Sequence, residues 1–125
     1  MSHPRASSTT ALDHVETTST GATAIKTIGP VEPYLSGHYP GNPVYPGVFL
    51  LDLCEKLVSQ CPAIERPFDR LNSLRFSAPT LPGDRIRIEL TLRYSPEGQL
   101  TGANFLGRAD TSEAEKKFTA RMSYS

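Results

Sequence analysis

The segment from residue 47 to residue 60 restricts the fold of this 125-residue chain more than any other. Its polar side chains recur at helical spacing and make one narrow stripe: Asp52, Glu55, Lys56, Ser59 and Gln60. The other positions, from Val48 to Cys61, are apolar. A helix with so wide an apolar arc has to be covered by other structure, so the rest of the chain must supply a surface around it.

Alternation of apolar and polar residues predicts that this surface is a sheet. The clearest strand runs from Ile86 to Tyr94, and further strands are predicted over residues 12–18, 22–28, 71–77, 99–109 and 118–124. Turns are predicted at Ser19-Thr20-Gly21 and at Ser95-Pro96-Glu97-Gly98. One helix and five to six strands, joined mostly by hairpins, predict an α+β fold with an antiparallel sheet. Residues 1–11 predict a flexible N-terminal arm ahead of a single domain over residues 12–125.

Composition argues against several classes of function. Thirteen basic and thirteen acidic residues balance, so we expect neither a nucleic-acid partner nor a membrane partner. No apolar run approaches the roughly 20 residues of a membrane span, and the N-terminus lacks the apolar core of a signal peptide, so we expect a cytoplasmic protein. Cys54 and Cys61 would lie about 10 Å apart along the helix, which predicts core thiols without a disulfide. The three histidines lack metal-ligand spacing, so we expect no metal.

The loop that leads into the helix carries the candidate chemistry. Between His38 and Asp52 lie three prolines and two glycines, and Pro46-Gly47 is a helix-start signal. Such a loop can hold an imidazole still beside a ligand. We expect Asp52 on the first turn of the helix. Taken alone, His38 is a turn residue and Asp52 a helix-start charge; together they suggest an acid–base pair around a helix N-terminus.

This loop and two other segments resemble the β-hydroxyacyl-acyl-carrier-protein dehydratases of fatty-acid and polyketide synthesis. The helix opens with Gly37-His38-Tyr39-Pro40-Gly41-Asn42-Pro43-Val44-Tyr45-Pro46-Gly47-Val48. Leu74-Arg75-Phe76-Ser77-Ala78-Pro79-Thr80-Leu81-Pro82-Gly83-Asp84 resembles the family's Phe-x-x-Pro-x-x-Pro-Gly-Asp segment, and Leu12-Asp13-His14-Val15 its first strand. The resemblance implies a hotdog fold, in which the sheet wraps around one long central helix. It also implies a substrate carried on the phosphopantetheine of acyl-carrier protein, with no cofactor of the enzyme's own.

The resemblance further implies a catalytic pair, His38 and Asp52, with the histidine of one subunit facing the carboxylate of its dimer partner. Backbone N–H groups near Gly47 and Val48 would hold the thioester oxygen, because a helix N-terminus offers unpaired donors and a positive dipole end. Neutral His38 would take the proton alpha to the thioester, and a protonated Asp52 would give one to the leaving β-hydroxyl. Water would leave, and a trans-2-enoyl thioester would remain.

Other candidate contacts are less specific. Tyr39, Tyr45 and Phe49 are interpreted as core or tunnel-wall residues. Arg75, together with Arg85 and Arg87, either attracts the phosphopantetheine phosphate or an acidic carrier protein, or is a solvated strand charge. The alternation of the strand places Arg85 and Arg87 on its polar face.

Two residues depart from the family pattern. The carboxylate is Asp52 instead of glutamate, which resembles the subfamily that also isomerises the double bond, whereas Tyr39-Pro40-Gly41-Asn42-Pro43 resembles the dehydratase-only type. The family's glutamine one turn later is Lys56, whose ammonium group at i+4 favours a charged carboxylate. A charged Asp52 would orient His38 or a water, and His38 would then carry both proton transfers.

The sequence therefore predicts a homodimeric 3-hydroxyacyl-[acyl-carrier-protein] dehydratase, a lyase of fatty-acid or polyketide biosynthesis. Three alternatives stay open. The first is a dehydratase–isomerase, which Asp52 suggests. The second is a hotdog thioesterase, against which the histidine loop argues. The third is a partner subunit of a heterodimer that binds acyl-carrier protein without catalysis.

Overall fold

The computed structural model of the chain describes residues 12–28, 47–81, 83–110 and 115–125. In these ranges it has one helix and six strands: β1 His14–Thr17, β2 Gly21–Thr27, α2 Gly47–Ser59, β3 Arg70–Phe76, β4 Arg85–Tyr94, β5 Leu100–Ala109 and β6 Lys116–Ser123. Every predicted helix and strand is confirmed, with ends that shift by two residues at most. The expected N-terminal arm and the loop that carries His38 lie outside the described residues.

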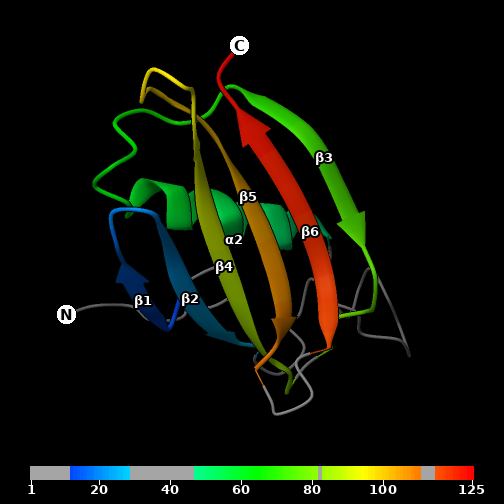
Figure 1. Cartoon of the computed structure of the whole chain (residues 1–125). Coiled ribbons are helices and arrows are strands. Elements are labelled where there is room, and N and C mark those ends of the chain that lie inside the picture. Colours follow the sequence, from blue (N-terminus) through cyan, green and yellow to red (C-terminus); the bar gives the residue numbers. More distant parts are fainter. Residues whose placement is uncertain (1–11, 29–46, 82, 111–114) are drawn as a thin grey trace, which may run out of the picture.

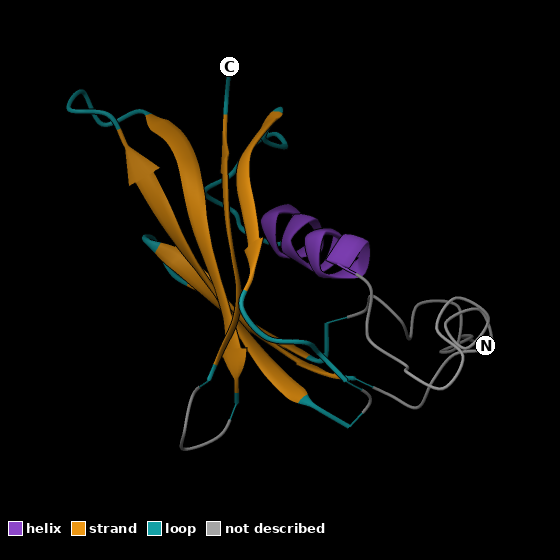
Figure 2. Ribbon diagram, turned by 90° about the vertical axis from the view of Figure 1, so that its right-hand side faces the viewer, coloured by secondary structure: helices purple, strands orange, loops and turns teal. Residues whose placement is uncertain are grey.

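The six strands form one sheet in the order β1-β2-β4-β5-β6-β3, and every neighbouring pair is antiparallel. Hairpins join β1 to β2, β4 to β5 and β5 to β6, while β2 pairs with β4 and β3 returns to pair with β6 (Figure 1). The helix α2 lies on one side of the sheet, and within the described ranges no helix covers the other face (Figure 2). The predicted α+β class and antiparallel sheet are confirmed. The helix α2 has thirteen residues, which does not establish the long central helix of the predicted hotdog fold, so that feature stays a prediction.

The core lies between α2 and the near face of the sheet. The helix buries the apolar arc predicted from its sequence, including Leu50, Leu53 and Leu57. Along β4 buried isoleucines and leucines alternate with arginines and threonine that face away from the helix. Phe105 and Phe118 are among the largest fully buried side chains, and a Cβ added at Gly107 would overlap the Phe118 ring. The bare backbone of β5 at this glycine therefore makes room for an aromatic ring of β6.

The polar stripe of α2 and its cysteines agree with the predictions. Glu55, Ser59 and Gln60 are exposed. Cys54 and Cys61 are free and buried, and the Cys61 Sγ donates to the Leu57 carbonyl at 3.3 Å. Burial raises the pKa of both thiols, so both are held as neutral core groups.

The segment from Pro79 to Asp84 is tied to the end of β2. The Gly83 N–H donates to the Ile28 carbonyl at 2.7 Å, and the Ile28 N–H donates to the Asp84 carbonyl at 2.8 Å. Lys117 of β6 is buried and donates from Nζ to the Pro79 carbonyl at 3.1 Å. These bonds fix the point from which the chain leaves β2 toward the loop that carries His38.

Candidate active site

The predicted site residues divide between described and undescribed parts of the chain. His38, Tyr39 and Tyr45 lie outside the described residues. Gly47, Val48, Phe49 and Asp52 lie on α2, and Arg75 lies on β3. The structure therefore describes the part of the predicted site that lies on α2 and β3.

The start of α2 is covered by an aromatic ring from β3. A Cβ added at Gly47 would overlap the ring of Phe76, so the ring occupies the space that any larger residue would fill. Gly47 and Val48 begin the helix, where backbone N–H groups have no intrahelical acceptor and the dipole is positive. Phe76 is itself 54% exposed. This arrangement suits a donor pair at the base of a partly apolar site.

Asp52 lies one turn deeper in the helix than predicted. Because α2 begins at Gly47, Asp52 is its sixth residue, and the first turn contains no acidic residue. The prediction of a first-turn carboxylate is wrong, because one helical turn contains 3.6 residues and so ends before Asp52. The macrodipole falls off within the first turn, so its effect at Asp52 is weak.

Asp52 is held by the lysine that departs from the family pattern. The Lys56 Nζ lies 3.5 Å from the Asp52 Oδ2, and the two side chains are 42% and 41% exposed. The interaction predicted from the i,i+4 spacing is therefore present. Within the single chain, the carboxylate has an ammonium partner and a wet environment instead of an apolar enclosure.

Phe49 and Arg75 lie on different sides of the sheet. Phe49 is half-buried and packs against the core cluster, as expected for a core or tunnel-wall residue. Arg75 is exposed and lies opposite Thr119 of β6 in the strand register. Both residues belong to the sheet face that is turned away from α2. The next residue, Phe76, reaches the helix from the near face. Our candidate residues did not include Phe76. It is the first residue of the Phe-x-x-Pro-x-x-Pro-Gly-Asp segment, and this motif position could have identified it.

A pocket follows the polar stripe of the helix beyond Asp52. It has a volume of about 430 Å³ and lies between α2, the segment 64–68 and Met122 of β6. Glu55 and Ser59 line it from the helix, and apolar side chains of Val58, Ile64 and Phe68 form its walls. Asp52 precedes Glu55 by about one turn on the same stripe and does not itself line the pocket.

Two other features of the described ranges concern metals and membranes. No three His, Cys, Asp or Glu side chains in these ranges gather as metal ligands. Among the residues that the structure covers, no helix has the length and apolar character needed to cross a bilayer.

Comparison with known proteins decides the family. Residues 14–115 match the family model described as "ApeI-like: ApeI dehydratase", which is well over half of the chain. The chain belongs to the ApeI-like dehydratase family. Membership confirms the predicted resemblance and the prediction of a dehydratase, an enzyme of the lyase class.

Relatives of this ApeI-like dehydratase agree with the assignment. It is 32% identical over 110 residues to the 3-hydroxyacyl-[acyl-carrier-protein] dehydratase FabZ of Pelotomaculum thermopropionicum, a match that covers 80% of this chain and 78% of that protein. The FabZ of Symbiobacterium thermophilum is 31% identical over 105 residues, with 76% and 73% covered. Among solved structures, the dehydratase heterocomplex ApeI:P from Xenorhabdus doucetiae has a TM-score of 0.72 at 18% identity, and the match covers 90% of this chain and 95% of that one. That likeness shows a shared fold.

The Gly47–Phe76 contact in this ApeI-like dehydratase gives a testable prediction. Gly47→Ala is expected to lower the free energy of unfolding by about 1–3 kcal/mol, because the new methyl group must displace the Phe76 ring. In a Phe76→Ala background the same change is expected to be neutral or stabilising, since alanine favours helix over glycine by up to about 1 kcal/mol. Urea unfolding of the four proteins measures the coupling. A Gly47→Ala effect that is equal in both backgrounds would contradict the contact.

Proposed function

We propose that this ApeI-like dehydratase removes water from a 3-hydroxyacyl thioester carried by acyl-carrier protein and releases a trans-2-enoyl thioester of the fatty-acid or polyketide type. The main support is α2 itself, which starts at Gly47 under the Phe76 ring, carries Asp52, and lines a pocket further along with Glu55, Val58 and Ser59. The FabZ relatives are named for this reaction.

The proposed reaction begins at the carbon between the thioester carbonyl and the hydroxyl-bearing carbon. Neutral His38 removes a proton from this carbon, and the electron pair of the C–H bond moves toward the thioester, whose oxygen gains negative charge. N–H groups of Gly47 and Val48 donate to that oxygen, and one such preorganised donor is worth about 3–4 kcal/mol in the transition state. The pair then forms the new C=C bond as the C–O bond breaks, and the hydroxyl leaves as water after it receives a proton.

The Lys56–Asp52 contact supports one of the two roles open to Asp52. An acid would be favoured by an apolar enclosure, whereas Asp52 is half exposed and paired with an ammonium group at 3.5 Å. We therefore assign the second proton transfer to His38, which returns the proton that it took from carbon. Asp52 then acts as a positioning residue, which orients the imidazole or a water.

The edge of β3 supports an assembly of two copies. Among the described strands, β3 pairs only with β6, and its other edge is open. It exposes two large apolar side chains, Leu71 at 45% and Phe76 at 54%. An open, apolar edge strand is a template for pairing with another chain. We propose that a second copy pairs there and completes the site, with His38 of one chain near Asp52 of the other. The resemblance to a heterocomplex makes a different partner chain the alternative.

A panel of carrier-linked 3-hydroxyacyl thioesters of different lengths tests the proposal. The purified chain, with a native mass of twice 13.7 kDa, is expected to convert at least one member to a product lighter by one water. Mass spectrometry identifies the loss, and chromatography against synthetic standards identifies the trans-2-enoyl isomer. Inactivity of the chain alone, restored by a second polypeptide, would replace the homodimer by a heterodimer. A cis-3-enoyl product would assign the chain to the dehydratase–isomerase alternative, and inactivity throughout would overturn the proposal.

A further inference from the structure

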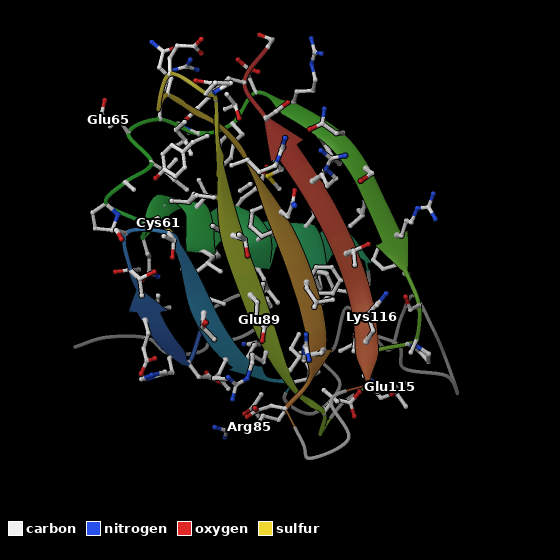
Figure 3. The ribbon with its side chains drawn as sticks, in the orientation of Figure 1. Cys61, Glu65, Arg85, Glu89, Glu115 and Lys116 are labelled. Atoms are coloured by element: carbon white, nitrogen blue, oxygen red, sulfur yellow. The ribbon has the colours of Figure 1, made fainter. Side chains whose placement is uncertain are left out.

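The sheet face turned away from α2 carries a groove with an excess of positive charge. The groove has a volume of about 650 Å³ and crosses β3, β4, β5 and β6. We call it the outer groove and define it by Arg75, Glu89, Asn104, Lys116, Thr119 and Arg121, which all line it. Figure 3 shows two of these residues, Glu89 and Lys116, on the face opposite the helix.

The cations of the outer groove have no acidic partners among the described residues. Arg75, Lys116 and Arg121 each lie on a strand, and no carboxylate of the described ranges forms an ion pair with any of them. Among the described residues, Glu89 is the one acidic residue that lines the groove. Its Oε1 already pairs with the Arg108 Nη2 at 3.4 Å. The groove therefore presents three unpaired positive charges in a chain whose formal net charge is zero.

The imbalance is confined to one part of this face. Arg85 lies at its lower end in Figure 3. Arg85 and Arg87 both pair with Asp110, with N–O distances of 2.7 and 3.0 Å. Hydrogen bonds from Arg85 and then Arg87 hold the pKa of the Asp110 carboxyl below its ordinary value of 3.8, so this cluster stays internally paired at neutral pH. The prediction that Arg85 and Arg87 share the polar face of their strand is confirmed. Both arginines pair with Asp110, so part of their positive charge is neutralised within the chain.

A further arginine adds to the crowding of like charges. The Arg93 guanidinium lies across β5 where Gly102 has no side chain, and it donates to the Met122 carbonyl at 2.7 Å. Burial and then the nearby Arg121 guanidinium lower the pKa of Arg93. The neighbouring strands thus hold Arg93 close to Arg121, one of the unpaired cations of the groove. This repulsion is relieved when an anionic group binds.

The dimensions and composition of the groove favour a protein as the anionic partner. Three spacings between its four strands make about 14 Å, which accommodates one α-helix with a diameter of about 10–12 Å. Asn104 and Thr119 add neutral hydrogen-bonding groups between the cations. Three unpaired cations on a neutral chain are few for a nucleic acid, whose affinity grows with the number of phosphates contacted.

We propose that the outer groove binds the acidic surface of the protein that delivers the substrate, the acyl-carrier protein. This inference rests on the proposed function, because that function requires a carrier. Arg75 belongs to the groove, and the adjacent Phe76 covers the start of α2 from the other face. A carrier in the groove would therefore lie at the end of β3 beside the candidate site. The proposal gives Arg75 the first of its two predicted roles, a contact with the carrier.

Charge reversal in the groove tests this proposal with two substrates. Lys116→Glu/Arg121→Glu leaves Arg75 unchanged, because Arg75 neighbours the ring at the helix start. With the carrier-linked 3-hydroxyacyl thioester, the double variant is expected to raise KM by about tenfold or more, since like charges would then oppose encounter. With the same acyl group on N-acetylcysteamine, which has no carrier, kcat/KM should stay within about twofold of wild type, because the groove lies away from the reacting atoms.

A matched variant and a binding measurement complete the test. Arg85→Glu reverses one charge on the same face but outside the groove, on a side chain that is 58% exposed, and leaves Arg87 to pair with Asp110. It is expected to leave KM for the carrier-linked substrate unchanged. Fluorescence anisotropy with labelled holo-carrier protein measures binding without turnover. The affinity is expected to fall as the salt concentration rises and to be lower for the double variant than for wild type. Equal binding and KM in wild type and double variant would overturn the inference, as would preferential binding of labelled duplex DNA. Inactivity with both thioesters, with carrier binding intact, would overturn the proposed function alone.

Discussion

His38→Ala is expected to lower kcat for dehydration of a carrier-linked 3-hydroxyacyl thioester by about 10⁴-fold, the upper end of the range for a general acid–base group. The loss is large because one imidazole both removes the proton from carbon and returns it to the leaving hydroxyl in the proposed mechanism. Steady-state turnover followed by mass spectrometry measures the loss. Circular dichroism and native mass of the variant serve as controls for folding and assembly.

The matched variant at the other end of the predicted pair is Asp52→Asn. It is expected to lower kcat for dehydration by about 10²-fold, less than His38→Ala. The reason is that an ion-paired carboxylate which orients the imidazole contributes through geometry and not through a proton of its own. Losses of equal size in the two variants would contradict this division of roles and would make Asp52 the acid.

Phe118→Ala is expected to have the largest effect on stability, a loss of about 3–5 kcal/mol in the free energy of unfolding. The ring is fully buried and lies over the bare backbone of Gly107, so its removal leaves a cavity that β5 has no side chain to fill. Such a loss is a large share of the roughly 5–15 kcal/mol that holds a domain of this size together. Urea unfolding followed by circular dichroism measures it.

Phe118→Leu is the control for this prediction, because it keeps an apolar side chain at the same position. It is expected to cost about 1–2 kcal/mol, since much of the volume is retained and only the shape changes. Similar losses for leucine and alanine would show that the ring, and not the filled space, accounts for the stability of this part of the core.

The elements of this fold could be predicted because their signals are local. Alternation from Ile86 to Tyr94 and the polar stripe of α2 each depend on neighbouring residues, and both were confirmed. The i,i+4 spacing likewise predicted the Lys56–Asp52 contact. The turn of the helix that holds Asp52 was predicted wrongly although its start at Gly47 was predicted correctly, because one turn contains 3.6 residues and Asp52 is the sixth.

The contacts that shape the candidate site are non-local, and no pattern of neighbouring residues encodes them. Gly47 and Phe76 meet because β3 returns to pair with β6 at the edge of the sheet, a pairing that no hairpin dictates. The position of Arg75 on the far face follows from the register between β3 and β6, which includes an irregularity between Leu71 and Ser73. The relation of His38 to Asp52 depends on a second chain in the proposed assembly.

The placement of Arg93 across Gly102 has a consequence for the entropy of recognition. A surface arginine ordinarily loses rotamer freedom when it meets an anion, at a cost of about 0.5–1.5 kcal/mol for each immobilised side chain. The Arg93 side chain is already fixed by its bond to the Met122 carbonyl and by the strand beneath it. Its order is therefore established when the chain folds. An anion that approaches this face meets a charge whose position is set in advance, and association need not order that side chain again.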